Sequence, residues 1–145
     1  MAAVNPYLTF DGTCEVAFNL YKKAFGGEFL MISRFGDMPA GDGSPEQCGP
    51  ADKDKIMHVA LPIGKNTILM GSDGPGNIPI TAGNQFSVAI QADSEAEADH
   101  LFNSLSAGGQ VFMPMGKAPW GAYFGMFADQ FGIQWLINFD YAQQS

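Results

Sequence analysis

The sequence MPMGKAPWGAYFGMFADQFGIQWLINF, residues 113–139, decides the fold class of this chain. Two runs of aromatic and branched residues, 120–128 and 133–139, flank a tight Asp129-Gln130-Phe131-Gly132 turn and predict two strands. In the second run a large apolar residue occupies every odd position, whereas Gln134, Leu136 and Asn138 occupy the even ones. We therefore expect the odd positions to face a helix and the even positions to line a partly hydrated pocket.

The rest of the chain follows one pattern twice. A strand at 7–10 precedes a helix that starts at a Thr13 cap and ends at Gly26-Gly27; strands at 28–35, 56–63 and 67–70 follow. In the second half a strand at 86–92 leads into a capping box, Ser94 to Glu97, and a helix that ends at Gly108-Gly109. A strand at 110–115 and the pair at 120–139 complete it.

This order predicts an α+β fold of two βαβββ modules, about residues 4–72 and 84–140, within a single domain, 1–145. A Gly/Pro-rich linker at 72–82 joins the modules. Each module has one helix for its sheet, so we expect the sheets to pair edge to edge around a curved groove. The sequence leaves open whether the modules pair within one chain or across a homodimer.

Composition excludes several classes of partner. The chain has 145 residues, 46% of them hydrophobic, and a net charge of −8 with no concentrated basic face, which argues against nucleic acid and anionic membranes. No apolar run approaches a membrane span, and the first ten residues lack a signal-peptide pattern. With only Cys14 and Cys48, we expect reduced thiols and a cytoplasmic protein.

Two Gly/Pro-rich segments interrupt the modules. Residues 36–54 are long for a loop and are interpreted as a surface loop, a lid or an interface arm. Residues 72–82 contain several glycines after a strand, but Pro75, Pro79 and the lack of a following helical pattern exclude a phosphate-binding loop.

The paired βαβββ pattern resembles the vicinal oxygen chelate superfamily, which includes glyoxalase I, bleomycin-resistance proteins and extradiol dioxygenases. More closely, the chain resembles the PhnB-like branch, in stretches that span nearly its whole length: PYLTFDGTCEVAFNLYKKAFGG (6–27), FGDMP (35–39), KDKIMH (53–58), ILMGSD (68–73) and WGAYFGMFADQFGIQWLIN (120–138). Members of this branch often carry a ubiquinone-methyltransferase name. The sequence has no Gly-rich strand–loop–helix segment that would hold S-adenosylmethionine, so we do not expect that activity.

The resemblance also implies a test for a metal. Catalytic members hold a divalent ion with His and Glu side chains on the first and last strands of the modules, and the matching positions here are Pro6, Phe86 and Leu136. None of these side chains binds a metal. We therefore predict no metal site and no cofactor. A divalent metal remains the alternative, because a one-residue strand slip would bring in Thr9, Asp73 or Asp129.

His58 is the candidate catalytic residue. On the strand at 56–63 it is either a half-buried histidine bonded to its neighbours, a general base or ligand-orienting group, or a lone metal ligand. The chain's other histidine, His100, falls beside the apolar stripe of the second helix and is expected at the surface.

The predicted ligand-binding groove contains His58, Trp120, Tyr123, Gln134, Leu136 and Asn138. Trp120 and Tyr123 are interpreted either as stacking partners for a planar ligand or as core residues. The favoured function is a PhnB-like homodimer that binds an unidentified small molecule. The sequence leaves open whether the protein is an enzyme; the alternatives are a metal-dependent glyoxalase- or dioxygenase-type enzyme acting on a small oxygenated substrate, and a structural dimer.

Overall fold

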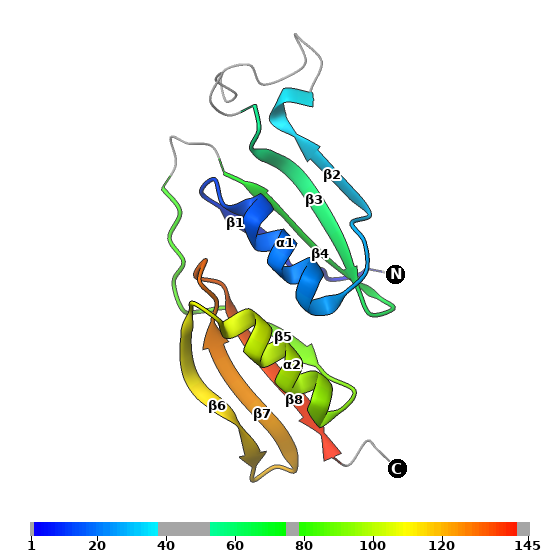
Figure 1. Ribbon diagram of the computed structural model, residues 1–145, viewed down its shortest axis with the longest axis vertical. Coiled ribbons are helices and arrows are strands. Elements are labelled where there is room, and N and C mark those ends of the chain that lie inside the picture. The colour runs from blue at the N-terminus through cyan, green and yellow to red at the C-terminus, as the bar shows by residue number, and fades with distance from the viewer. Residues whose placement is uncertain (1, 38–52, 75–78, 142–145) are drawn as a thin grey trace. The chain divides into compact units, whose positions relative to one another are not determined.

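The computed structural model describes residues 2–37, 53–74 and 79–141 (Figure 1). The chain divides into two compact units, Met1–Thr81 and Ala82–Ser145. Cys48, most of the 36–54 loop and part of the 72–82 linker lie outside the described residues. No helix in the described ranges has the length and apolar character needed to cross a bilayer.

The first unit is a four-stranded sheet with one long helix. Its elements are β1 (Tyr7–Phe10), α1 (Cys14–Phe25), β2 (Met31–Arg34), the short 3-10 helix η1 (Phe35–Asp37), β3 (Ile56–Ile63) and β4 (Thr67–Asp73). The strand order is β1-β4-β3-β2. β1 runs parallel to β4, and the other neighbours are antiparallel.

The second unit repeats this arrangement. It contains β5 (Val88–Gln91), α2 (Glu95–Ser106), β6 (Gln110–Ala118), β7 (Ala122–Ala128) and β8 (Gln134–Asp140). The strand order is β5-β8-β7-β6, again with one parallel pair, β5 and β8. The predicted pair of βαβββ modules is therefore confirmed.

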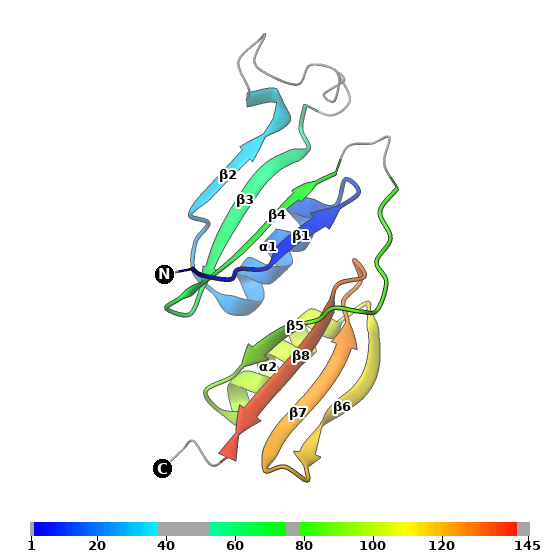
Figure 2. The ribbon, with the colours of Figure 1, turned by 180° about the vertical axis from the view of Figure 1, so that it is seen from behind.

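In each unit the helix lies against one face of the sheet, as Figure 1 shows. Figure 2 views the units from behind, where the sheets lie in front of their helices. We call the sheet face that carries no helix the open face of that unit. Because strand side chains alternate between faces, each strand contributes to both the core and the open face.

The core of the first unit forms where α1 packs on β3 and β4. The apolar spacing of α1 buries five residues against the sheet: Cys14, Ala17, Phe18, Tyr21 and Ala24. Burying a side chain such as Phe18, which is 0% exposed, stabilises the fold by roughly 2 kcal/mol. Gly71 on β4 permits this contact, since a Cβ there would lie 2.7 Å from the Phe18 ring.

The second unit packs α2 on β7 and β8 in the same way. The Phe102 and Phe127 rings meet edge to face with centroids 5.0 Å apart. Trp135, Ile137 and Phe139 alternate as buried residues along β8, which confirms the periodicity expected for this strand. Gln134, Leu136 and Asn138 take the intervening, half-buried positions.

The helix starts differ in detail from the prediction. Ser94 Oγ accepts a hydrogen bond from Glu97 N at 3.0 Å, as a capping box requires. The return bond runs from Asp93 N to Glu97 Oε1, at 2.8 Å, one residue earlier than expected. At α1, Thr13 holds the N-cap position but its side chain makes no capping bond.

Strand lengths also differ from the prediction. β2 and β5 are shorter than the runs 28–35 and 86–92, and Phe86 lies outside β5 with 84% of its surface exposed. β4 and β6 extend past residues 70 and 115. Apolar composition identified these strands, whereas hydrogen-bonded pairing with a neighbour sets their ends.

Candidate functional site

Two adjacent rows of residues on the open face of the first unit surround His58. Cross-strand partners share a face, so the pairs Tyr7–Met70, Met70–Ala60 and Ala60–Met31 form one row across all four strands. The neighbouring positions Thr9–Ser72 and Ser33–His58 form the second. The first row is apolar apart from the Tyr7 hydroxyl, and the second carries hydroxyl and imidazole groups.

His58 contacts Tyr7 across this face. Their ring centroids lie 5.9 Å apart with planes inclined by 31°. Tyr7 is 49% exposed and His58 is half-buried, so the aromatic pair forms part of the accessible surface of the sheet. An accessible imidazole beside an aromatic ring can both accept a proton and stack on a planar molecule.

Ser33 lies directly opposite His58 on the adjacent strand β2. Its Oγ is buried, and no group in the described part of the chain forms a hydrogen bond with it. The β2–β3 ladder is irregular here, because Ser33 pairs with His58 while Arg34 pairs with Ile56, which leaves Met57 without a partner in the register. Bulges of this kind redirect side chains and are frequent beside functional sites.

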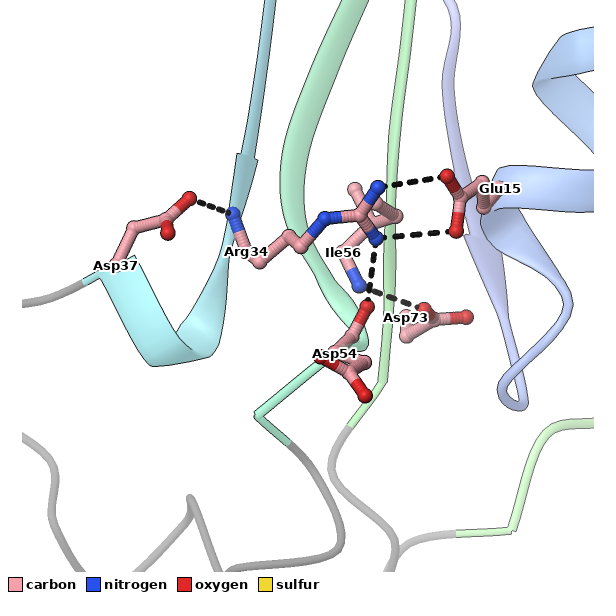
Figure 3. Close-up of polar contacts among 6 residues, drawn as sticks. All are labelled: Glu15, Arg34, Asp37, Asp54, Ile56 and Asp73. Atoms are coloured by element: carbon pink, nitrogen blue, oxygen red, sulfur yellow. Dashed lines mark hydrogen bonds and ion pairs between the residues drawn. The ribbon is translucent and has the colours of Figure 1, made fainter.

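Arg34, the last residue of β2 and the neighbour of Ser33, bonds to several surrounding groups (Figure 3). Its guanidinium donates to both carboxylate oxygens of Glu15 on α1, at 3.0 and 2.6 Å, and to the Asp54 carbonyl at 2.8 Å. Asp37 Oδ2 accepts from the Arg34 backbone nitrogen at 2.9 Å. These bonds tie β2 to α1 and to the residues before β3, and so hold Ser33 opposite His58.

Asp73 positions the start of β3 from the helix-covered side. Its Oδ2 accepts from Ile56 N at 2.8 Å, and its Oδ1 accepts from Cys14 N at 3.0 Å. Burial, with the nearby Asp73 and Glu15 carboxylates, raises the pKa of the Cys14 thiol to about 12. Cys14 is therefore a thiol at neutral pH and not a nucleophile.

The open face of the second unit differs in chemistry. Gln134, Leu136 and Asn138 share it on β8, beside Met126 and Phe124 of β7, which pair with Leu136 and Asn138. Gln134 donates to the Gly83 carbonyl at 2.9 Å. Asn138 donates to Gln91 at 2.9 Å and to Asp140 at 3.0 Å. The bonds of these two amides fix them in place beside an apolar surface.

Trp120 and Tyr123 lie in different environments. Trp120, in the turn between β6 and β7, is 63% exposed and packs edge to face on Phe124, with centroids 5.4 Å apart. Tyr123 pairs with Phe139, and its hydroxyl donates to Asp99 of α2 at 2.7 Å. Tyr123 thus lies on the helix-covered face, apart from Gln134, Leu136 and Asn138, because adjacent β7 residues face opposite sides.

The structure places the predicted site residues in two sets. His58 lies in the first unit with Tyr7 and Ser33, two residues that were not predicted from the sequence. Gln134, Leu136, Asn138 and Trp120 lie in the second unit. His100 is exposed on α2. A polar residue inside the apolar run FLMISRF (29–35) was the available signal for Ser33, but its position opposite His58 depends on the register between β2 and β3, which the sequence does not show.

The residues at the positions where catalytic relatives hold a metal ion cannot bind one in this chain. Pro6, Phe86 and Leu136 offer no side-chain donor atom, and no cluster of three or more His, Cys, Asp or Glu side chains occurs in the described ranges. Asp73 and Asp129, considered as replacements, both bind backbone groups. Asp129 accepts from Phe131 N at 2.9 Å, from Ile133 N at 3.0 Å and from the Trp135 indole at 2.9 Å.

Residues 3–137 match the family model of the Glyoxalase/Bleomycin resistance protein/Dioxygenase superfamily. The chain belongs to this superfamily. Family membership explains the repeated βαβββ unit and the identical strand order of the two sheets. It does not assign a reaction, since one fold hosts many activities.

Several known proteins resemble the chain over nearly their whole length. Protein YjdN of Escherichia coli is 31% identical over 139 residues, 93% of each protein. The structure of PA1353 from Pseudomonas aeruginosa matches with a TM-score of 0.83 and 41% identity, covering 97% of this chain and 98% of that one. A PhnB protein from Bacillus cereus shares the fold, with a TM-score of 0.76, 24% identity and 95% and 99% coverage. The expected likeness to PhnB-like proteins is thus confirmed for the fold.

Proposed function

We propose that this protein binds a small molecule on the open faces of its sheets and does so without a conventional metal site. The observation that carries the proposal is the open face of the first unit. There, an accessible imidazole and a buried serine hydroxyl, which has no hydrogen-bond partner among the described residues, adjoin a row containing Tyr7, Met31 and Met70. Such a mixture of apolar surface with few polar groups is typical of small-molecule sites.

The open face of the second unit supports the same proposal. Leu136 and Met126 offer apolar area, and the amides of Gln134 and Asn138 are held by hydrogen bonds within the unit. Polar groups that are already oriented lose little conformational freedom when a ligand arrives. Trp120, exposed beside Phe124, adds an aromatic surface at the end of this face.

The alternative function is a metal-dependent enzyme of the glyoxalase or dioxygenase type. The residues at the family's metal positions argue against it. Metal analysis of protein purified without chelators separates the two functions. Stoichiometric zinc, nickel, manganese or iron supports the enzyme, and its absence supports the metal-free binder.

A thermal-shift screen with a panel of small oxygenated metabolites tests binding directly. A ligand present at 100 times its Kd stabilises the folded protein by about 2.7 kcal/mol, which a melting curve resolves. The His58→Ala variant should reduce the shift given by a hit that binds the first unit, and Leu136→Ala should reduce the shift given by a hit that binds the second. His100→Ala, at an exposed position on α2, serves as the matched control. A hit that is unaffected by both open-face variants would contradict the proposed site.

We further propose that the protein acts as a homodimer in the cytoplasm. The outer strands β2 and β6 each carry exposed apolar residues, Met31 and Ile32 on one and Val111, Phe112 and Met113 on the other. Exposed apolar edge strands favour pairing with another chain. Size-exclusion chromatography with light scattering is expected to give twice the chain mass; a monomer at micromolar concentration would contradict the dimer.

A further inference from the structure

We propose that Ser33, His58 and Tyr7 form a subsite for a planar or apolar molecule that bears a carbonyl or carboxylate oxygen. Ser33 and His58 donate hydrogen bonds to that oxygen, and Tyr7 packs against the body of the molecule. The inference rests on the proposed binding function and deepens it by naming the residues and the ligand chemistry.

The buried hydroxyl of Ser33, which has no hydrogen-bond partner in the described part of the chain, is the first support. A buried hydroxyl without a partner is costly, and native proteins satisfy nearly all such groups. Among the described residues only this side-chain oxygen or nitrogen is buried without a partner. Its position opposite His58 places a second donor on the next strand, at the distance of a directly paired residue.

The chemistry of the two rows selects the kind of group that binds. Neutral imidazole offers one N–H donor, serine offers one O–H donor, and a carbonyl or carboxylate oxygen has the lone pairs to accept from both. The second row also contains Thr9 and Ser72, and neither row has a carboxylate among its described members. A cation would therefore find only neutral partners there, whereas an oxygen acceptor finds several donors.

The apolar row accounts for the rest of the molecule. Tyr7 and Met31 are 49% and 45% exposed, and Met70 lies between them with Ala60. Tyrosine faces and methionine side chains pack well on flat apolar groups. The two adjacent rows thus match a molecule with an apolar body and an oxygen at its edge.

Ser33 acts here as a binding residue and not as a nucleophile. Serine attack requires a base that holds its proton, at hydrogen-bond distance. Ser33 Oγ forms no hydrogen bond with His58 or with any other described group. The same fact predicts that Ser33→Ala folds with a melting temperature equal to or above that of the parent, since it removes an unsatisfied polar group.

The experiment uses benzoate, acetophenone and toluene as probes of the full-length protein. The imidazole resonances of the two histidines are followed by NMR, with the exposed His100 of α2 as the internal reference. Benzoate and acetophenone, which carry the acceptor oxygen, should shift the His58 resonances but not those of His100. Toluene, which lacks the oxygen, should bind more weakly. If only benzoate shifts the His58 resonances, the subsite binds a carboxylate. If acetophenone also shifts them, the subsite binds a neutral carbonyl.

Ser33→Ala and Tyr7→Leu then test the individual roles. Ser33→Ala should weaken probe binding about five- to tenfold, the value of one hydrogen bond, without lowering the melting temperature. Tyr7→Leu should weaken binding of all three probes. No shift of His58 with either oxygen-bearing probe, or a Ser33→Ala variant that binds as the parent does, overturns the subsite. If a metabolite then still stabilises the protein and Leu136→Ala abolishes the effect, the proposed function stands and only this subsite fails.

Discussion

Asp73, the last residue of β4, accepts a hydrogen bond from the backbone nitrogen of Cys14, the first residue of α1, at 3.0 Å. The other carboxylate oxygen accepts from Ile56 N, the first residue of β3, at 2.8 Å. One buried carboxylate thus joins three elements and replaces the cap that the Thr13 side chain does not supply. It also fixes the strand that carries His58.

Asp73→Ala is expected to lower the free energy of unfolding by about 3 kcal/mol, because two backbone N–H groups would remain buried without an acceptor. Asp73→Asn should cost less, since its amide oxygen still accepts one of the two bonds. Urea denaturation followed by circular dichroism measures both. Asp11→Ala, at an exposed position just before α1, is the control and should stay within about 0.5 kcal/mol of the parent. Equal stability of the Asp73→Ala and Asp11→Ala proteins would show that Asp73 has no such role.

The ion pair between Glu15 and Arg34 should add pH-dependent stability of about 0.5 kcal/mol, a small value because both side chains are partly solvated. The hydrogen bond from Arg34 lowers the pKa of Glu15 below its ordinary value of 4.5. A lowered folded-state pKa means that the contribution is present above pH 4.5 and is lost as the pH falls through the folded value. The stability difference between the parent and Glu15→Gln should therefore disappear in acid. Urea midpoints at neutral and acidic pH measure it, and a difference that grows in acid would refute the assignment.

A glycine in each helix-covered face permits close packing, and Gly125 of β7 can be tested against Gly116 of β6. A Cβ at Gly125 would lie 2.6 Å from Met115 Sδ and 2.8 Å from the Phe102 ring, whereas a Cβ at Gly116 meets only the Pro114 carbonyl, at 3.9 Å. Gly125→Ala should destabilise the second unit by about 1–3 kcal/mol through overpacking. Gly116→Ala should remain within about 0.5 kcal/mol of the parent. Thermal unfolding ranks the two variants, and the reverse order would contradict close packing at Gly125.

The sequence predicted the elements of the fold well because each depends on local chemistry. Apolar spacing gave α1 and α2, and alternation from 133 to 139 gave the two faces of β8. The Asp129 turn was also visible from sequence. The hydrogen bond that stabilises this turn could not be predicted from the sequence, because the Trp135 indole and the Asp129 carboxylate are six positions apart and meet only in the folded chain.

The candidate site was harder to predict because it depends on pairing between strands. Alternation alone placed His58 on one side of its strand, but Tyr7 and Ser33 meet it only through the register of β1, β4, β3 and β2. The bulge at Met57 shifts the β2–β3 register by one residue only beyond the Ser33–His58 pair, so that Arg34 pairs with Ile56. The register of β7 has the opposite effect on Tyr123, because it removes this residue from the predicted groove. Its aromatic ring suggested a ligand contact, but its side chain lies on the helix-covered face and bonds to Asp99.

The Tyr123–Asp99 bond gives a final prediction, at alkaline pH. The hydrogen bond to Asp99, with burial and the negative charges of Asp99 and Glu95, raises the pKa of Tyr123 to about 12, from an ordinary value of 10. A raised folded-state pKa means that the bond's contribution is complete below pH 10 and is lost as the pH rises through about 12. Asp99→Asn should return the titration of Tyr123 toward 10, because an amide does not carry the charge that opposes the phenolate.

Phenolate absorbance during an alkaline titration measures this change. The Tyr141 hydroxyl donates to Glu95, and this bond raises the pKa of Tyr141 to about 12 as well. The titrations of Tyr123 and Tyr141 must therefore be distinguished. Tyr141→Phe, tested with and without Asp99→Asn, isolates Tyr123. In the Tyr141→Phe background, Asp99→Asn should lower the pH at which one tyrosine, Tyr123, ionises. Overlapping titration curves with and without Asp99→Asn would mean that Asp99 does not hold the Tyr123 proton.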